Sequence, residues 1–200
     1  MPVIRNLPLL LGLALLGACA SHHEEQPLTT EVSRSAAYAP GVPGGVVTAV
    51  EELRAKVVAL DRSKRSFTLE DEQGNRHTVV APPEMVNYPQ LQVGDKVRAR
   101  VKVEGTMYLR EPGAAVQSAT AVAMTPPKGS KPGLLVIGSQ ELTAVVKAID
   151  SVQHTATLQF ADGSSNTYKV RPDVQIKKEY LNREVVIRLD SEVAVSVEAQ

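Results

Sequence analysis

Apolar and polar residues alternate with a period of two in many short stretches of this chain. The clearest run covers residues 96–103, where every second residue is apolar. Such alternation is typical of a strand with one buried face. Similar runs recur through residues 47–200, separated by clusters of Gly, Pro, Asp and Asn. The sequence therefore predicts an all-β protein, in which the following residues face a core: Val97, Ala99, Val101 and Val103.

The chain also contains an internal repeat. Residues 52–61 return as residues 141–150, with six of ten aligned positions identical. The agreement continues from Thr68 against Thr157 and, after a one-residue shift, to Arg100 against Arg188. A repeat of this length indicates a duplicated structural unit.

Each copy carries runs for about five short antiparallel strands in roughly 60 to 70 residues. A small open sheet exposes its edges, and closure into a barrel removes them. We therefore expect two tandem five-stranded β-barrels, OB-like or SH3-like, over residues 47–124 and 134–200. Residues 125–133, rich in Pro and Gly, are predicted to be the linker.

Glycines mark two expected turns in the first copy. Gly105 is expected to open its last hairpin, and Gly94 to turn the chain into the run at 96–103. The second copy has Asn182 and Arg183 where the first has Gly94 and Asp95. Its turn is therefore expected to differ.

The N-terminal residues predict export. Residues 7–16 are almost wholly apolar after a single cation, Arg5, and end in Gly17 and Ala18. Residues 1–18 thus read as a secretory signal peptide, too short to span a bilayer by itself. Cys19, the only cysteine, follows directly. An exported protein with an unpaired thiol is the other interpretation.

Leu16-Gly17-Ala18-Cys19 resembles the lipobox of bacterial lipoproteins. The resemblance implies that Cys19 is lipidated and becomes the mature N-terminus, so that the protein is anchored in the cell envelope. Ala20, in place of an aspartate, resembles the outer-membrane sorting signal. The expected location is the outer membrane, facing the periplasm.

Residues 19–46 are expected to be a lipid anchor and flexible tether. They are polar, contain several Pro and Gly residues and show no sustained periodicity. The tether includes four adjacent donors that could bind a metal ion: His22, His23, Glu24 and Glu25. On a flexible segment these donors are unorganised, and a solvated linker is the alternative.

The repeat motif is Ala-x-Val-x-x-Leu/Ile-Asp followed by Thr-Leu and Gly, with residues 93–97 reading Val-Gly-Asp-Lys-Val in the first copy. It resembles small periplasmic OB-type barrel domains, including uncharacterised envelope families and, more distantly, copper-chaperone-like domains. That resemblance implies a metal site of Met, His and Trp. This chain has no Trp, and its candidates do not reproduce the spacing: Met85, Met107, His77 and His154. No metal site or cofactor is predicted, and the two methionines are expected in a core.

Composition disfavours two function classes. The net charge is zero and there are two Phe, five Tyr and no Trp, which argues against nucleic-acid binding. No catalytic motif is present. Asp61 and Asp150 precede polar turns and are expected to bond their own backbone. The sequence does not predict an enzyme.

The candidate binding surface is a cationic stripe of four residues: Lys96, Arg98, Arg100 and Lys102. Strand alternation places them on one face over about 20 Å. The stripe could meet an envelope protein or an anionic glycan or lipid. In the alternative, these cations pair with Glu51, Glu52 or Glu70. The sequence thus predicts a non-catalytic binding or scaffolding module, with metal binding or oligosaccharide binding as alternatives.

Overall fold

The computed structural model describes residues 27–113 and 116–200. The predicted signal peptide, Cys19 and the His22–Glu25 donors lie outside the described residues. The described elements are β1 (Glu31–Ala37), β2 (Gly44–Asp61), β3 (Ser66–Asp71), β4 (Arg76–Val80), η1 (Tyr88–Gln90), β5 (Lys96–Arg110), β6 (Gln117–Met124), β7 (Gly133–Asp150), β8 (Thr155–Phe160), β9 (Ser165–Lys169), η2 (Lys178–Tyr180) and β10 (Glu184–Glu198). The prediction of an all-β fold is confirmed.

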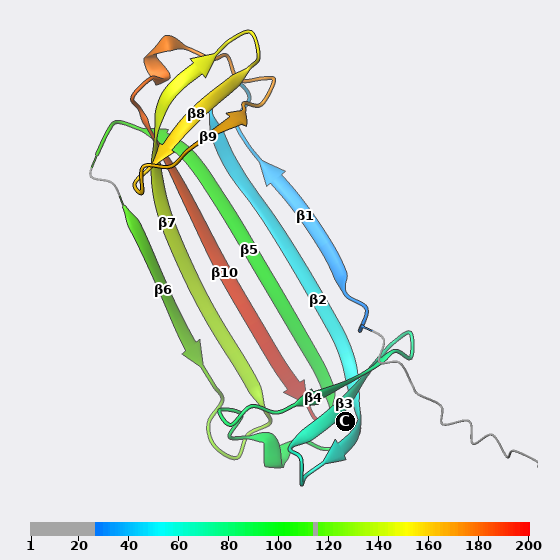
Figure 1. Cartoon of the computed structure of the whole chain (residues 1–200). Coiled ribbons are helices and arrows are strands. Elements are labelled where there is room, and N and C mark those ends of the chain that lie inside the picture. Colours follow the sequence, from blue (N-terminus) through cyan, green and yellow to red (C-terminus); the bar gives the residue numbers. More distant parts are fainter. Residues whose placement is uncertain (1–26, 114–115) are drawn as a thin grey trace, which may run out of the picture.

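The ten strands form a single antiparallel sheet that is not closed into a barrel. Its order is β4-β3-β2-β5-β10-β7-β8-β9, with β1 beside β2 and β6 beside β7 (Figure 1). The prediction of two tandem barrels is not confirmed. The reason lies in β5, which pairs along its whole length with β10 of the other repeat. Its edge is covered there, so closure within one repeat is not needed to satisfy its backbone groups.

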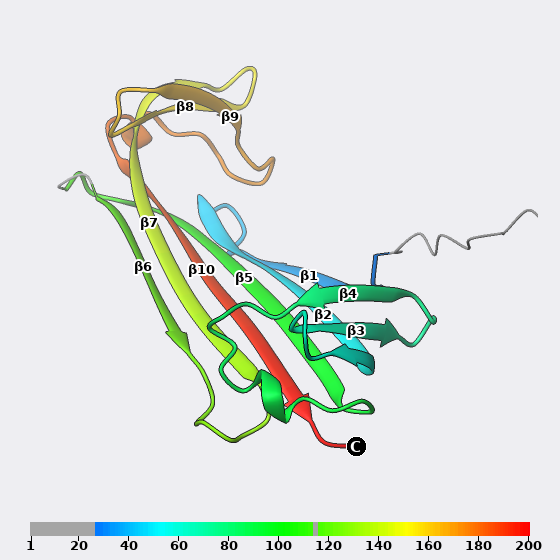
Figure 2. The same cartoon turned by 60° about the horizontal axis from the view of Figure 1, so that its bottom comes forward.

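The two repeats are related by a pseudo-two-fold axis through the centre of the sheet. Val103 of β5 pairs with Ser191 of β10, and these are corresponding positions in the two repeats. An axis perpendicular to the sheet at this pair maps each face onto itself. The hairpins β3–β4 and β8–β9 therefore fold toward the same side of the sheet (Figure 2). We call this side the hairpin face and the opposite side the outer face.

Four strands are unusually long, with 18 residues in β2 and β7 and 15 in β5 and β10. Ordinary strands have three to ten residues. The hairpin expected at Gly105 does not form, because β5 continues through it. A Cβ at this glycine would lie 3.4 Å from Leu189 Cδ2 on the neighbouring strand. Gly105 thus accommodates a side chain across the strand pair.

Two separate cores lie at the ends of the long strands. The first contains Ala55, Val57, Phe67, Leu69, Ala81, Tyr88, Leu91 and Val97. The second contains Ala144, Val146, Leu158 and Val185. Val195 and Val197 of β10 pack on the first core, and Leu109 of β5 packs on the second. Each core therefore draws on both repeats.

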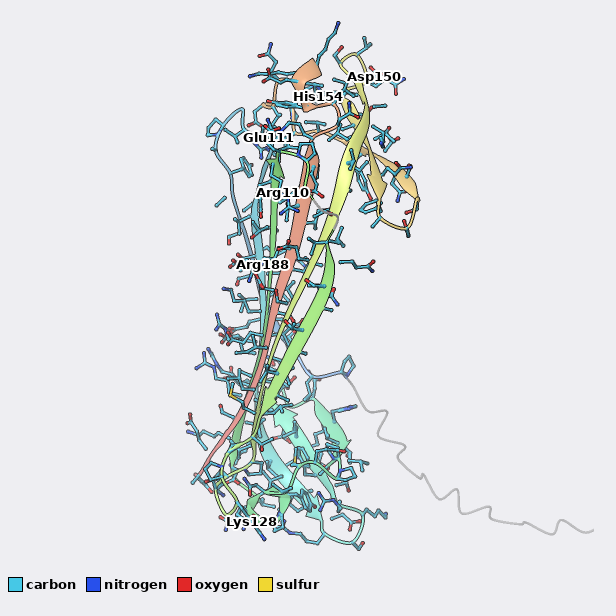
Figure 3. All side chains as sticks on the ribbon, turned by 90° about the vertical axis from the view of Figure 1, so that its left-hand side faces the viewer. Arg110, Glu111, Lys128, Asp150, His154 and Arg188 are labelled. Carbon is cyan, nitrogen blue, oxygen red and sulfur yellow. The ribbon has the colours of Figure 1, made fainter. Side chains whose placement is uncertain are left out.

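The middle of the sheet is a single layer between these cores (Figure 3). Val97 is buried, as predicted, but Val101 and Val103 are 37% and 38% exposed. The expectation that the whole apolar side of this strand faces a core was wrong. Both hairpins are short, and neither reaches the centre of the hairpin face.

The segments expected to be a tether and a linker are partly ordered. Within the tether range, β1 pairs with β2 from Glu31–Glu52 to Ala37–Val46. The linker is fixed to the first core. There Asn87 Nδ2 donates to the Pro127 carbonyl at 3.0 Å, and Lys131 Nζ lies 2.7 Å from the buried Asp95 carboxylate. The polar composition of these two segments gave no sign that their backbone groups and charged side chains have partners in the rest of the chain.

The turns before β5 and β10 are the same, contrary to expectation. Gly94 N donates to Val57 O, and Asn182 N donates to Val146 O, each at 2.8 Å. Gly94 has φ +100° and Asn182 has φ +66°. Asn is one of the few non-glycine residues that tolerate the left-handed region, so it replaces glycine here.

This turn generates a stability prediction. We expect Asn182→Gly to change the free energy of unfolding by less than about 1 kcal/mol, because glycine adopts the same φ. Asn182→Val should lower it by about 1 to 3 kcal/mol, because a β-branched residue is strained at positive φ. Denaturant unfolding measures both, with Asn166→Val in strand β9 as a control that should have little effect. Equal destabilisation by the glycine and valine variants would contradict the prediction.

A candidate apolar binding cavity in the second repeat

The second core is hollow. A cavity of about 560 Å³ lies between the hairpin face and the β8–β9 hairpin. Its apolar lining includes Met107, Leu109, Ile187 and Leu189 from the sheet and Ala156 and Leu158 from β8. Binding cavities for small molecules are typically 300 to 1,000 Å³ and mostly apolar, so this one has a suitable size and character.

The repeat explains why this end contains the apolar cavity. In the first core the rings of Phe67 and Tyr88 fill the corresponding space, with their centroids 6.4 Å apart. Ala156 occupies the position of Phe67. The short helix η1 begins at Tyr88, whereas its counterpart η2 begins at Lys178. Tyr180, at the end of η2, lines the cavity.

One difference between the repeats adds a large side chain to the second repeat instead of removing one. Phe67 pairs with Val79 across β3 and β4, whereas Ala156 pairs with Tyr168 across β8 and β9. The large residue has therefore moved to the other strand of the hairpin. Tyr168 is nevertheless 46% exposed, so its ring borders the cavity without filling it.

The cavity opens onto the middle of the hairpin face. Met107 and Leu189 at this opening are 44% and 41% exposed, and Val47 is also exposed. The exposed apolar residues continue along the sheet to Val101 and Val103. Contiguous apolar surface of this kind marks a binding or interaction site.

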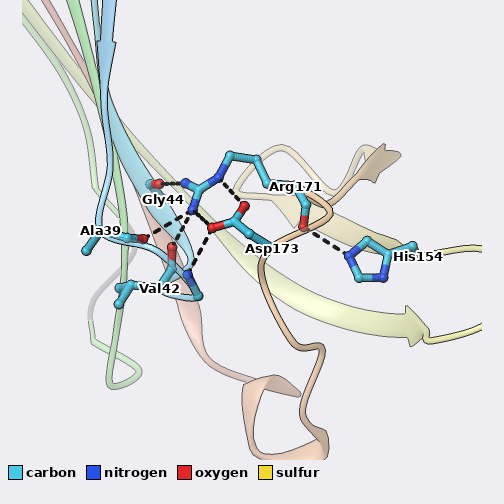
Figure 4. Close-up of polar contacts among 7 residues, drawn as sticks. Ala39, Val42, Gly44, His154, Arg171 and Asp173 are labelled. Atoms are coloured by element: carbon cyan, nitrogen blue, oxygen red, sulfur yellow. Dashed lines mark hydrogen bonds and ion pairs between the residues drawn. The ribbon is translucent and has the colours of Figure 1, made fainter.

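Arg171, which lines the cavity, is the centre of an arginine clamp. Figure 4 shows the polar contacts of this clamp. Arg171 Nη2 lies 2.8 Å from Asp173 Oδ2 and donates to the carbonyl oxygens of Ala39 at 3.3 Å and Val42 at 3.2 Å. Arg171 Nη1 donates to the Gly44 carbonyl. Its Cζ lies 4.0 Å from the centroid of the Tyr38 ring, a cation–π contact.

The clamp fixes the β1–β2 connection of the first repeat to the second core. Asp173 Oδ2 also accepts a hydrogen bond from Gly41 N at 2.9 Å. The bond from Arg171, followed by that from Gly41, holds the pKa of Asp173 well below its usual range. The first repeat has Pro82 and Glu84 at the corresponding positions, so the clamp is not part of the repeated fold.

The methionines and histidines considered as metal ligands do not form one cluster. Met85 packs against the first core, as expected, but Met107 lines the cavity opening. His77 lies on β4, and His154 Nε2 is 3.0 Å from the Arg171 carbonyl oxygen. Within residues 27–113 and 116–200, no group of three or more His, Cys, Asp or Glu side chains is arranged to hold a metal ion.

The four cations of the predicted stripe share the outer face, and carboxylates lie between them. Arg98 Nη2 is 3.0 Å from Glu52 Oε2. Arg100 lies 3.4 Å from Glu52 and 3.9 Å from Glu192, and Lys102 lies 3.1 Å from Glu104. The hydrogen bond from Arg98 is the main cause of the lowered pKa of Glu52.

Only one of the three expected carboxylate partners is used. Glu52 pairs with the stripe, whereas Glu51 lies opposite Val101 on the hairpin face and Glu70 pairs with Arg76. Glu192 was not predicted, because its approach depends on the pairing of β5 with β10.

The two repeated aspartates act in turns, as predicted. Asp61 Oδ1 accepts hydrogen bonds from Ser63 N and Lys64 N at 3.0 and 3.1 Å. Asp150 Oδ1 accepts from Val152 N and Gln153 N, both at 2.8 Å. These bonds stabilise the β2–β3 and β7–β8 turns.

No protein-family model, curated protein or solved structure matches this chain. Among the helices of the described residues, none has the length and apolar character needed to cross a membrane.

Sequence patterns alone did not point to the cavity. Its residues belong to ordinary alternating strands, and none has a reactive side chain. The available signal was the aligned pair Phe67 and Ala156, in which a large core residue is replaced by a small one. The sequence does not show whether another side chain fills the space that Ala156 leaves, because that depends on the order of the strands.

The clamp predicts a pH-dependent contribution to stability. The folded-state pKa of Asp173 is depressed, so its contribution is present above the unfolded-state pKa of about 3.9 and is lost as pH falls below it. Asp173→Asn should therefore lower the unfolding midpoint at pH 7, and its difference from the wild type should shrink progressively below pH of about 4.

Thermal unfolding from pH 7 to pH 2 measures this effect. Glu84→Gln changes the corresponding position of the first repeat, which has no ion pair among the described residues, and serves as the control. A difference between wild type and Asp173→Asn that stays constant at all pH values would contradict the assignment.

Proposed function

We propose that this chain is a non-catalytic, lipid-anchored protein of the bacterial envelope that binds an apolar chain of an amphiphile in the cavity of its second repeat. The observation that carries this proposal is the apolar cavity of the second repeat, which is open to the hairpin face. In the first repeat two aromatic rings fill the corresponding space. The ligand class is a molecule with a long acyl chain, such as a membrane lipid or fatty acid.

The distribution of polar groups supports an amphiphile. The interior lining is formed by aliphatic residues of β5, β8 and β10, and the cationic lining residues are Lys169 and Arg171. Burying a carboxylate or phosphate against aliphatic side chains is unfavourable, whereas each buried methylene contributes about 0.8 kcal/mol. A tail inside the cavity and a polar head outside it satisfy both conditions.

The predicted signal peptide supports the proposed location. A signal peptide followed by Cys19 would leave the protein attached to the membrane that contains such lipids. A single acyl anchor binds reversibly, and several chains hold more firmly. In this proposal Cys19 provides attachment, and the cavity provides the binding function.

An anionic partner of the cationic stripe is a second candidate. On the outer face, Lys96 lies opposite Lys56 and Arg98 lies opposite Arg54 in neighbouring strands. Like charges placed directly opposite one another destabilise a sheet. Glu52 pairs with both Arg54 and Arg98, so the repulsion that an anionic glycan or acidic protein surface would relieve is the one between Lys56 and Lys96. Arg98→Glu with Arg100→Glu should abolish such binding, measured by pull-down of envelope components.

The cavity proposal predicts that Ala156→Phe weakens binding of a fluorescent long-chain fatty acid by about tenfold or more, because the ring removes space for methylenes worth about 0.8 kcal/mol each. Fluorescence titration measures the Kd. Mass spectrometry of lipids extracted from the purified protein should show the same loss. Val152→Phe adds the same ring at a highly exposed position of the β7–β8 turn and should leave binding unchanged.

A second variant separates binding from misfolding. Met107→Glu introduces a charge at the cavity opening, on a residue already 44% exposed, and should also weaken binding. Circular dichroism checks that both variants are folded. Unchanged fatty-acid affinity in both folded variants would overturn the proposed function.

A further inference from the structure

Two arginines of the β2–β3 turn carry charges that no carboxylate offsets. Neither Arg62 nor Arg65 lies within ion-pair distance of an acidic side chain in the described part of the chain. Lys64, between them, pairs with Asp61 at 3.7 Å. The turn at this end of the sheet thus has two guanidinium groups with uncompensated charge.

Both guanidinium groups are held in place by neutral partners. Arg62 Nη1 donates to the Tyr88 carbonyl at 3.0 Å, and Arg62 Nη2 donates to the Leu91 carbonyl. Arg65 Nη2 donates to the carbonyls of Pro82 and Met85, both at 3.2 Å. Their Cζ atoms lie 5.2 and 5.1 Å from the centroid of the Tyr88 ring.

These contacts leave donors available at a surface pocket. A guanidinium has five N–H groups, and the carbonyls use only some of them. Arg65 Nε is buried, so it is not among the donors that a ligand in the pocket could reach. Arg62, Arg65, Tyr88 and Pro89 line a pocket of about 340 Å³. Arg62 is exposed, so its remaining N–H groups are within reach of a ligand in this pocket.

The second repeat shows that the turn does not need these charges. Ser151 and His154 occupy the positions of Arg62 and Arg65. His154 has φ +57° and Arg65 has φ +50°, so the backbone is the same. His154 Nε2 contacts the Arg171 carbonyl, the counterpart of the Pro82 carbonyl. A histidine therefore suffices for the structural contact, and the two arginines add charge and donors.

We propose that Arg62 and Arg65 form a binding site for a phosphate group at the pocket beside Tyr88. Arginine donors match the geometry of phosphate oxygens, and the interaction between opposite charges strengthens each hydrogen bond. The carbonyl contacts and the Tyr88 ring hold both side chains in position before binding, which reduces the conformational entropy lost.

A lipid headgroup and a soluble phosphate compound share this chemistry. The first described residues lie at the same end of the molecule, because Leu28 packs on the first core and Thr29 N donates to Asp71 Oδ2 at 2.8 Å. Residues 19–27 span at most about 30 Å when fully extended. If Cys19 carries the proposed lipid anchor, membrane phosphates lie within reach of this pocket.

The test replaces both arginines by their counterparts from the second repeat. The full mature chain with Cys19→Ser removes the anchor, and Arg62→Ser with Arg65→His removes the site. Vesicles of phosphatidylglycerol and phosphatidylethanolamine are used for cosedimentation, and inorganic phosphate is titrated by calorimetry. We expect the parent to bind at least one probe about tenfold more tightly than the double variant.

A charge-matched control distinguishes a site from general attraction. Lys64→Ser with Lys128→Ser also removes two cations, one from the same turn and one from the ordered linker, and leaves the pocket intact. It should retain most of the binding. Equal loss in the control and the double variant would overturn the proposal, as would absence of binding to both probes.

The two probes identify the source of the phosphate. Vesicle binding without affinity for inorganic phosphate assigns the pocket to a lipid headgroup, whereas affinity for inorganic phosphate that Arg62→Ser removes assigns it to soluble phosphates. Arg62 is exposed, so Arg62→Ser alone should fold. This single variant tests the proposal if the double variant does not fold. The Ala156→Phe cavity variant lies at the other end of the sheet, so failure of one proposal does not imply failure of the other.

Discussion

The antiparallel pairing of β5 with β10 is the interaction on which the rest of this structure depends. It joins the two repeats from Lys96–Glu198 to Arg110–Glu184 without interruption. A slip of one residue would move every side chain of one repeat to the opposite face relative to the other. The register centred on Val103 and Ser191 therefore fixes both hairpins on the same side and gives both cores equivalent positions.

Because this pairing carries the sheet between two cores, the two ends can differ. The first core is filled by Phe67 and Tyr88 and also anchors the ordered linker through Asn87 and Asp95. The second has half as many buried residues in its core and encloses the cavity. Its missing internal contacts are partly replaced by the Arg171 clamp, which fastens a connection from the first repeat. More buried core side chains thus lie at one end, and the apolar cavity lies at the other.

The sequence predicted local structure well and long-range pairing poorly, for a physical reason. Period-two alternation and the Asp61 and Asp150 turns are local, and the structure retains them. Alternation looks the same whether a strand pairs within its own repeat or with the other one, so nothing in residues 96–110 excluded barrel closure. Gly105 predicts a turn, because a glycine that makes room for Leu189 is indistinguishable in sequence from one that bends the chain.

Local sequence patterns do not reveal the two candidate sites either, but comparison of the two repeats does so in part. Two copies that fold alike form an internal control, since a residue needed only for folding should have an equivalent partner. Gly94 and Asn182 satisfy that test. Phe67 against Ala156 does not, nor do Arg62 and Arg65 against Ser151 and His154. The differences fall at the cavity and at the arginine pocket, at opposite ends of the sheet. Divergence that leaves the backbone unchanged but alters space and charge is the pattern that the two proposed ligand sites would produce.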